Sequence, residues 1–172
     1  MINFFEISYL LSGNEKQIKA YQILTAHKVL EKLTVYSPVL VGTIPINIDI
    51  EGSDLDIICE ISDQNVFINE LKNLFGGENG FVITESLKFE AIKANFIING
   101  FEIEIFGQNT PTTLQNAYRH MLIEHKLILE KGEEFRQEII SLKKRGYKTE
   151  PAFAKLLGLE GDAYEELLKL EY

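Results

Sequence analysis

The sequence predicts an α+β fold in which helices flank a mixed β-sheet and a C-terminal helical region follows. Three observations lead to this class. Strand-like apolar runs and helical patterns succeed one another between residues 14 and 107, Asn99-Gly100 separates two alternating runs, and only helical patterns follow Pro111. We therefore expect an α+β core at residues 1–110 and a helical region at residues 111–172 that packs on this core.

The expected core begins with a helix and two strands. Residues 14–34 carry apolar side chains at helical spacing, and the pattern ends at Ser37-Pro38 because the residue before a proline disfavours helix. Residues 39–41 form a short apolar run that is typical of a buried strand. Proline, asparagine and glycine in residues 44–52 predict a loop, and the β-branched run at residues 55–61 predicts the second strand.

A helix and a hairpin complete the expected core. Residues 63–75 place their apolar side chains on one helical side, and Asp63 suits the N-cap. A short strand is expected at residues 81–83. The Asn-Gly pair then predicts a tight turn between two longer strands, at residues 89–98 and 101–106.

Three helices are expected after the sheet. Pro111 introduces a long helix, Gly132 ends it, and a second helix follows at residues 133–145. A last, shorter helix follows Thr149, since Pro151 suits an early helical position.

Composition narrows the class of protein. A chain of 172 residues with 45% hydrophobic side chains is long enough to bury a core, and no apolar run is long enough to cross a membrane. The N-terminal residues lack the basic segment and cleavage site of a signal peptide. The single cysteine, Cys59, cannot form an internal disulfide, so we expect a reducing, cytoplasmic setting.

The charge distribution bears on the partner. The formal net charge is −9, and residues 1–110 hold 15 acidic and 7 basic side chains. Proteins that grip a nucleic-acid backbone normally present a basic surface, so we do not expect a nucleic-acid partner. An acidic core can still bind a nucleotide where a divalent metal offsets the repulsion.

A cluster of carboxylates is the clearest candidate for chemistry. Asp54 and Asp56 open the second strand, and alternate side chains of a strand point to the same face. Two neighbouring carboxylates repel each other unless a cation lies between them, and Mg²⁺ prefers oxygen ligands. Glu104, on a later strand, is the expected third carboxylate; Glu102 lies on the same face and is the alternative. We expect Asp54, Asp56 and Glu104 to bind Mg²⁺ or Mn²⁺.

Other residues are candidates for contact with a nucleotide. Gly42 would let the backbone approach a phosphate, and the Thr43 hydroxyl and neighbouring amides would donate hydrogen bonds to it. Ser53 is a further candidate for contact with the nucleotide. Arg119, in the long helix, has the reach to contact a triphosphate, and His120 beside it to contact a base or an acceptor. Both also suit a purely structural role, in which they form salt bridges or hydrogen bonds between helix and sheet.

These motifs resemble the signature of the polymerase-beta-like nucleotidyltransferase superfamily. The signature has a small-residue turn after a short strand, an Asp-x-Asp at the next strand and a later acidic residue; here these correspond to Gly42-Thr43, Gly52-Ser53-Asp54-Leu55-Asp56 and Glu104. The resemblance implies that Asp54 and Asp56 bind metal, that Glu104 helps to activate an acceptor hydroxyl, and that the turn contacts phosphate. Thr43 and Glu104 depart from the commoner glycine or serine and aspartate.

The whole chain is also similar to a bacterial family of unknown function with a nucleotidyltransferase-like fold. The matching stretches are residues 52–60, 104–108, 115–121 and 148–154. Together, residues and resemblance imply a Mg²⁺-dependent nucleotidyltransferase that moves a nucleotidyl group from an NTP to a small-molecule or protein acceptor. The alternatives are a catalytically inactive nucleotide-binding or regulatory module of the same fold, and a toxin–antitoxin component.

Overall fold

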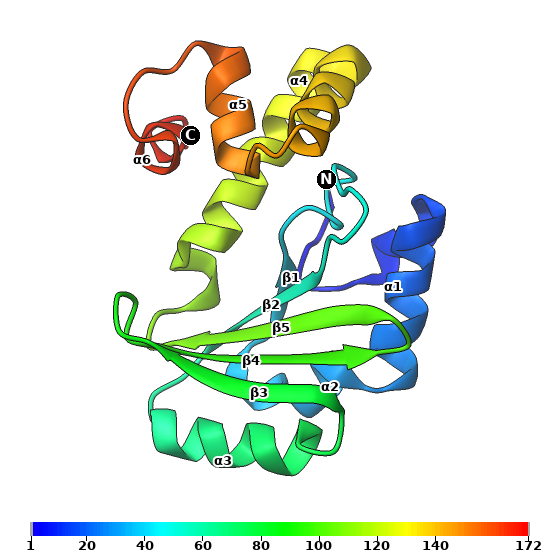
Figure 1. Ribbon diagram of the computed structural model, residues 1–172, viewed down its shortest axis with the longest axis vertical. Coiled ribbons are helices and arrows are strands. Elements are labelled where there is room, and N and C mark those ends of the chain that lie inside the picture. Colours follow the sequence, from blue (N-terminus) through cyan, green and yellow to red (C-terminus); the bar gives the residue numbers. More distant parts are fainter. Residues whose placement is uncertain (1, 172) are drawn as a thin grey trace.

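The computed structural model describes residues 2–171, and within them helices cover both faces of one five-stranded sheet (Figure 1). The α+β class is therefore confirmed. The strand order is β1-β2-β5-β4-β3; β2 and β5 are parallel and the other neighbours are antiparallel. The strands are β1 (Val39–Val41), β2 (Leu55–Glu60), β3 (Asn79–Ser86), β4 (Ala91–Ile98) and β5 (Phe101–Gln108).

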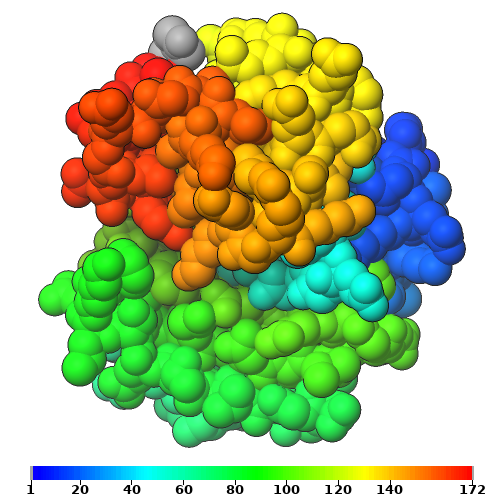
Figure 2. Space-filling model, turned by 45° about the horizontal axis from the view of Figure 1, so that its top comes forward, coloured from blue at the N-terminus to red at the C-terminus, as the bar shows by residue number. Residues whose placement is uncertain are grey.

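The helices divide between the two sides of the sheet. In the view of Figure 1, α3 lies below the sheet and α4, α5 and α6 lie above it. Figure 2 shows the C-terminal residues, yellow to red, packed as a block over the green and cyan residues of the sheet. The helices are α1 (Glu15–Ala26), α2 (Val29–Lys32), α3 (Gln64–Phe75), α4 (Asn116–Lys144), α5 (Thr149–Leu157) and α6 (Ala163–Leu168).

Two hydrophobic clusters follow from the alternation of side chains along the strands. Ile57 of β2 and Ile105 of β5 belong to the cluster that packs against α1 and α3. Ile58 belongs to the other cluster, with residues of α4 and α5 such as Met121 and Phe153. Because side chains alternate, Asp56 and Glu104 lie on the face that α4 and α5 cover.

Most of the predicted elements are confirmed, with local differences. Asp63 is the N-cap of α3, and its Oδ1 accepts a hydrogen bond from the Val66 amide at 3.0 Å. The expected first helix is divided, because Lys28 takes a left-handed conformation with φ of 54°. Gly132, with φ of 84°, interrupts α4 where a helix end was predicted.

Two further differences concern the ends of elements. β3 is longer than the expected strand at residues 81–83, because pairing with β4 extends it from Asn79 to Ser86. α6 was not predicted as a separate helix.

Among the described residues, no helix combines the length and apolar character that crossing a membrane requires.

Candidate active site

A cavity of about 580 Å³ lies between the sheet and the helices above it. Its sheet wall includes Gly42 and Thr43, which follow β1, together with Asp56 of β2 and Glu104 of β5. Its helical wall is formed by the first half of α4 and the start of α5. A volume of this size is typical of small-molecule sites.

The register of the sheet brings two of the expected carboxylates together. β2 and β5 pair in parallel with Asp56 opposite Glu104, and both side chains line the cavity. Burial, and to a lesser extent the charges of Asp54 and Glu104, raises the pKa of Asp56 to about 7, whereas the charges of Lys93 and Lys143 oppose the shift. Asp54, two residues before Asp56, is half-buried and is not part of the cavity wall.

Glu104 is held by two side chains of the neighbouring strand. Its Oε2 lies 2.7 Å from Lys93 Nζ and accepts a hydrogen bond from Asn95 Nδ2 at 3.3 Å. Glu102 instead lines a separate hollow with Ser53. Of the two alternative third carboxylates, Glu104 is therefore the one that shares a cavity with Asp56.

The carboxylates do not form a ready metal cage. Within residues 2–171, no group of three or more histidine, cysteine, aspartate or glutamate side chains is arranged to hold a metal ion. Glu104 is instead ion-paired with Lys93. The donor set still fits a hard cation: the carboxylates supply oxygen ligands, and the charges of Asp54 and Glu104 add to the burial that raises the pKa of Asp56.

Gly42 makes room for the Asp56 carboxylate. Gly42 has φ of +84°, and a Cβ at this position would lie 2.5 Å from Asp56 Oδ2. Any side chain here would therefore be strained and would displace the carboxylate. Glycine is therefore required at this position because the Asp56 carboxylate lies against it. The sequence had instead suggested that the glycine leaves space for a phosphate.

Thr43 and Ser53 lie at the two ends of the loop between β1 and β2. Thr43 lines the cavity, and its hydroxyl donates to Ser53 Oγ at 3.4 Å. Ser53 Oγ also accepts a hydrogen bond from the Ile50 amide at 2.9 Å. Ser53 thus closes the loop on itself, and it does not line the cavity that contains Asp56.

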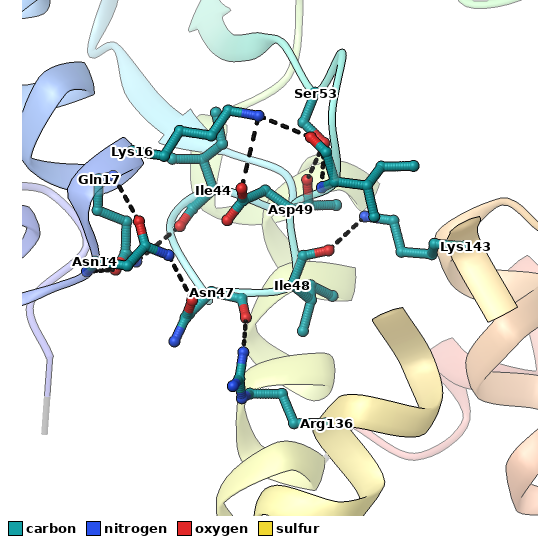
Figure 3. A network of polar contacts seen from close by, with 12 residues as sticks. Asn14, Lys16, Gln17, Ile44, Asn47, Ile48, Asp49, Ser53, Arg136 and Lys143 are labelled. Carbon is teal, nitrogen blue, oxygen red and sulfur yellow. Dashed lines mark hydrogen bonds and ion pairs between the residues drawn. The ribbon is translucent and has the colours of Figure 1, made fainter. Parts of the chain in front are cut away.

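Two helices hold this loop from opposite sides (Figure 3). From α1, Gln17 Nε2 donates to the Ile44 carbonyl at 2.8 Å, and Lys16 Nζ donates to the Ile50 carbonyl at 2.7 Å. Each of these carbonyls also accepts a backbone hydrogen bond within the loop, so the side chains of α1 add a second bond that fixes the chain just before Asp54.

From α4, two cations reach the same loop. Arg136 Nη1 donates to the Asn47 carbonyl at 2.6 Å, and the buried Lys143 donates from Nζ to the Ile48 carbonyl at 2.7 Å. Burial lowers the pKa of Lys143 to about 8, against the opposing effect of nearby carboxylates such as Glu124 and Asp49. From the sequence, Lys143 is expected in the C-terminal turn of a helix, with a polyanion-binding patch as the alternative, and no local pattern reveals its distant partner.

Arg119 and His120 point to different places. Arg119 forms an ion pair with Glu171, donates to Asn116 Oδ1 at 3.2 Å and borders a second, smaller hollow. The structure does not bring it to the cavity of Asp56. His120 does line that cavity, and its Nε2 lies 2.9 Å from the Tyr164 carbonyl oxygen.

Two glutamates of the helical wall were not singled out from the sequence. Glu124 is 4% exposed, and its Oε1 has no hydrogen-bond partner among the described residues. Burial raises the pKa of Glu124 well above its usual range, and the charge of Glu150 raises it further. The signal was present: Glu124 lies three residues after Met121 and three before Leu127, on the apolar stripe of α4.

The sheet order, the paired carboxylates and the turn beside them define a nucleotidyltransferase-like fold, and solved structures agree. The Cid1 poly(U) polymerase, solved with Mg and 3′-dATP, is 14% identical, with a TM-score of 0.57 over 76% of this chain and 41% of that chain. The polymerase core of TRAMP is 14% identical, with a TM-score of 0.53 over 94% and 50%. The structure of the GLD-2/RNP-8 complex is 14% identical, with a TM-score of 0.52 over 93% of this chain and 57% of that chain.

The chain belongs to the family described as "Domain of unknown function (DUF4269)", which matches residues 22–170. A comparison with curated protein sequences gives no match. The chain spans between 41% and 57% of the length of the three solved structures above, so the similarity concerns the fold that they share with it.

Proposed function

We propose that this protein is a divalent-metal-dependent nucleotidyltransferase that moves an NMP group from an NTP to a hydroxyl of a small molecule. The observation that carries the proposal is the position of Asp56. It lies in register with Glu104 on the wall of a cavity of about 580 Å³, and Gly42 gives it space. The nucleotidyltransferase-like fold supports the same reading, because its solved examples include polymerases.

In the proposed reaction, the acceptor hydroxyl oxygen bonds to the α-phosphorus of the NTP. The bond from that phosphorus to the bridging oxygen of the β-phosphate breaks, and pyrophosphate leaves. The hydroxyl proton passes to a carboxylate of the site, for which Glu104 is our assignment. When bound, Mg²⁺ or Mn²⁺ would neutralise the phosphate charge and lower the barrier to attack.

The protein's own residues would bind and orient the reactants. Asp54 and Asp56 would hold the metal, and the Thr43 hydroxyl would donate to a phosphate oxygen from the cavity wall. The bonds from Gln17 and Lys143 to the loop would keep Thr43 and Asp54 in place while the charge redistributes. Lys93 would move from Glu104 when the metal or the substrate enters, since its charge is then better placed against phosphate.

Charge and volume favour a small acceptor. The net charge of −9 opposes a polynucleotide, although solved structures with a similar fold include an RNA terminal U-transferase. The cavity is of a size that suits a nucleotide and a compact acceptor rather than a macromolecule. A protein acceptor would have to present one side chain to the cavity.

The test is release of pyrophosphate from each of the four NTPs with Mg²⁺ or Mn²⁺, in the presence of a cell-metabolite extract as acceptor source. We expect release from at least one NTP, and none from the Asp54→Asn and Asp56→Asn variants. Asp63→Asn is the matched control, because Asp63 only caps α3 and asparagine also caps helices. Release that persists in Asp56→Asn would contradict the assignment.

A second function is favoured by one specific observation. Glu104 is ion-paired with Lys93, and Asp54 is not part of the cavity wall, so the carboxylates are not assembled for metal among the described residues. This arrangement suits a nucleotide-binding module that does not turn its ligand over. Metal-dependent binding of an NTP without pyrophosphate release would favour this function over transfer.

A further inference from the structure

The helical wall of the cavity presents hydrogen-bond acceptors without donors. Glu124 reaches the cavity from α4, is 4% exposed, and leaves its Oε1 without a partner among residues 2–171. An orphaned buried oxygen is costly, and native structures rarely keep one without a ligand or water to satisfy it. The oxygen therefore points to a missing donor.

His120 adds a second acceptor beside it. The carbonyl oxygen of Tyr164 lies 2.9 Å from Nε2, and a carbonyl only accepts, so Nε2 carries the proton. In the neutral ring, Nδ1 is then an acceptor. It lies 3.6 Å from Glu150 Oε1, which is also an acceptor and is too far away for a direct hydrogen bond. With the ring neutral, His120 Nδ1 and Glu150 Oε1 thus face one another as two acceptors, with no hydrogen bond between them.

Lys143 is a cation of α4, but it does not act as the missing donor to Glu124 or Glu150. Lys143 donates from Nζ to the Ile48 carbonyl, and among the described residues it forms no ion pair with Glu124 or Glu150. Its charge lowers the pKa of Glu124, but burial and Glu150 raise it by more. The need for a donor at this wall is therefore unmet by the protein.

We propose that Glu124, Glu150 and His120 bind the ammonium group of a small amino alcohol whose hydroxyl receives the nucleotide. This inference rests on the proposed function and names its acceptor class. An ammonium group has three N–H donors and a positive charge, which match three acceptors and two carboxylates. A hydroxyl has a single donor, so it would leave two of the three acceptors without a partner.

The geometry of the cavity links this subsite to the carboxylates of the sheet. Asp56 and Glu104 line one wall of the same cavity of about 580 Å³, and Glu124 and Glu150 line the other. A compact amino alcohol held by its ammonium group therefore has its hydroxyl within the space that borders Glu104. Met121, a buried residue of the helical wall, lines the same cavity and adds an apolar surface next to the ammonium group.

Calorimetric titration with glucosamine and glucose tests the inference. The two sugars differ by one ammonium group in place of a hydroxyl, and a chelator removes any contribution from metal. We expect glucosamine to bind at least about tenfold more tightly than glucose, as a lost charge-assisted hydrogen bond implies. Equal affinity for the two sugars, or no binding of either, would overturn the inference.

Variants locate the subsite. Glu124→Gln keeps the shape of the side chain and removes its charge, and should weaken glucosamine binding by about tenfold. Glu138→Gln, on the exposed side of the same helix, is the matched control. Glu150→Gln, at a more exposed position, serves if Glu124→Gln does not fold. The inference is also overturned if Glu124→Gln binds glucosamine as tightly as the control Glu138→Gln does. If Glu124→Gln does not fold, the same comparison is made between Glu150→Gln and Glu138→Gln.

A separate titration of the wild-type protein with Mg·ATP, Mg·GTP, Mg·CTP and Mg·UTP distinguishes the two proposals. If an NTP binds and glucosamine shows no preference over glucose, the amino-alcohol subsite is wrong and the proposed function stands. If no NTP binds, the proposed function is wrong, whatever the sugars show.

Discussion

Replacing Asp56 with asparagine should stabilise the metal-free protein, and the gain should grow with pH. The pKa of Asp56 is raised from 3.8 to about 7 by burial and by the charges of Asp54 and Glu104. A carboxyl group with a raised pKa holds its proton more tightly in the folded state than in the unfolded state. Stability is therefore highest below the unfolded pKa and falls as the pH rises through the folded pKa.

The magnitude follows from the two pKa values. Each pH unit between them corresponds to about 1.4 kcal/mol, so the ionised carboxylate costs the folded protein up to about 4 kcal/mol above pH 7. At about pH 5, little more than one unit above the unfolded pKa, the cost is about 1.5 kcal/mol. Asp56→Asn removes this cost. The gain in its free energy of unfolding over the wild type should therefore increase by up to about 3 kcal/mol from about pH 5 to above pH 7.

Urea unfolding followed by circular dichroism, in the presence of a chelator, measures this gain. Asp63→Asn is the control and should show no pH-dependent gain, because its carboxyl caps a helix at an exposed position. Adding Mg²⁺ at about pH 8 should stabilise the wild-type protein and leave Asp56→Asn unchanged. A gain of equal size at both pH values would refute the reasoning, since it would not come from ionisation of Asp56.

Three further predictions concern the surroundings of Asp56. Gly42→Ala should cost at least about 1 kcal/mol in unfolding free energy and weaken Mg²⁺ binding, because φ is +84° and the new Cβ would meet Asp56 Oδ2; wild-type values for both would contradict this. Lys143→Met leaves the Ile48 carbonyl without its donor, so it should lower the free energy of unfolding by about 1–3 kcal/mol and speed amide hydrogen exchange in residues 43–50. Unchanged exchange in these residues would show that Lys143 does not hold the loop. Lys93→Met frees Glu104, so Mg²⁺ affinity, measured by calorimetry, should rise by about threefold to tenfold; weaker binding would show that Lys93 supports the site.

The elements of the fold were predictable where local chemistry is decisive. Asn99-Gly100 forms the expected turn, and both residues have positive φ, 48° and 83°, which these two residue types tolerate best. Asp63 caps α3 because a short carboxylate reaches the amide three residues on. The left-handed Lys28 that divides the first helix was not predictable, since nothing in the chemistry of lysine favours that conformation.

The candidate site was predictable only in part. Gly42, Thr43, Asp56 and Glu104 come together at one cavity, whereas Arg119 and Ser53 do not line it. Arg119 is drawn to Glu171, which is 52 residues away in the chain, so no pattern around Arg119 indicates the pairing. Glu124 was not predicted, because its spacing places it on the apolar stripe of α4 but does not show that its Oε1 is buried without a partner.

Spacing in the sequence is enough to tell which side chains of a strand share a face. The alternation along a strand is a local property of the backbone, so Asp54 with Asp56, and Glu102 with Glu104, follow from spacing alone. That Glu104, and not Glu102, lies opposite Asp56 is known only from the folded chain, because the register between β2 and β5 depends on packing across the whole sheet. That α4 and α5 bring Glu124, Glu150 and His120 over the same cavity is likewise known only from the folded chain, since contacts between distant segments are set by the burial of both faces.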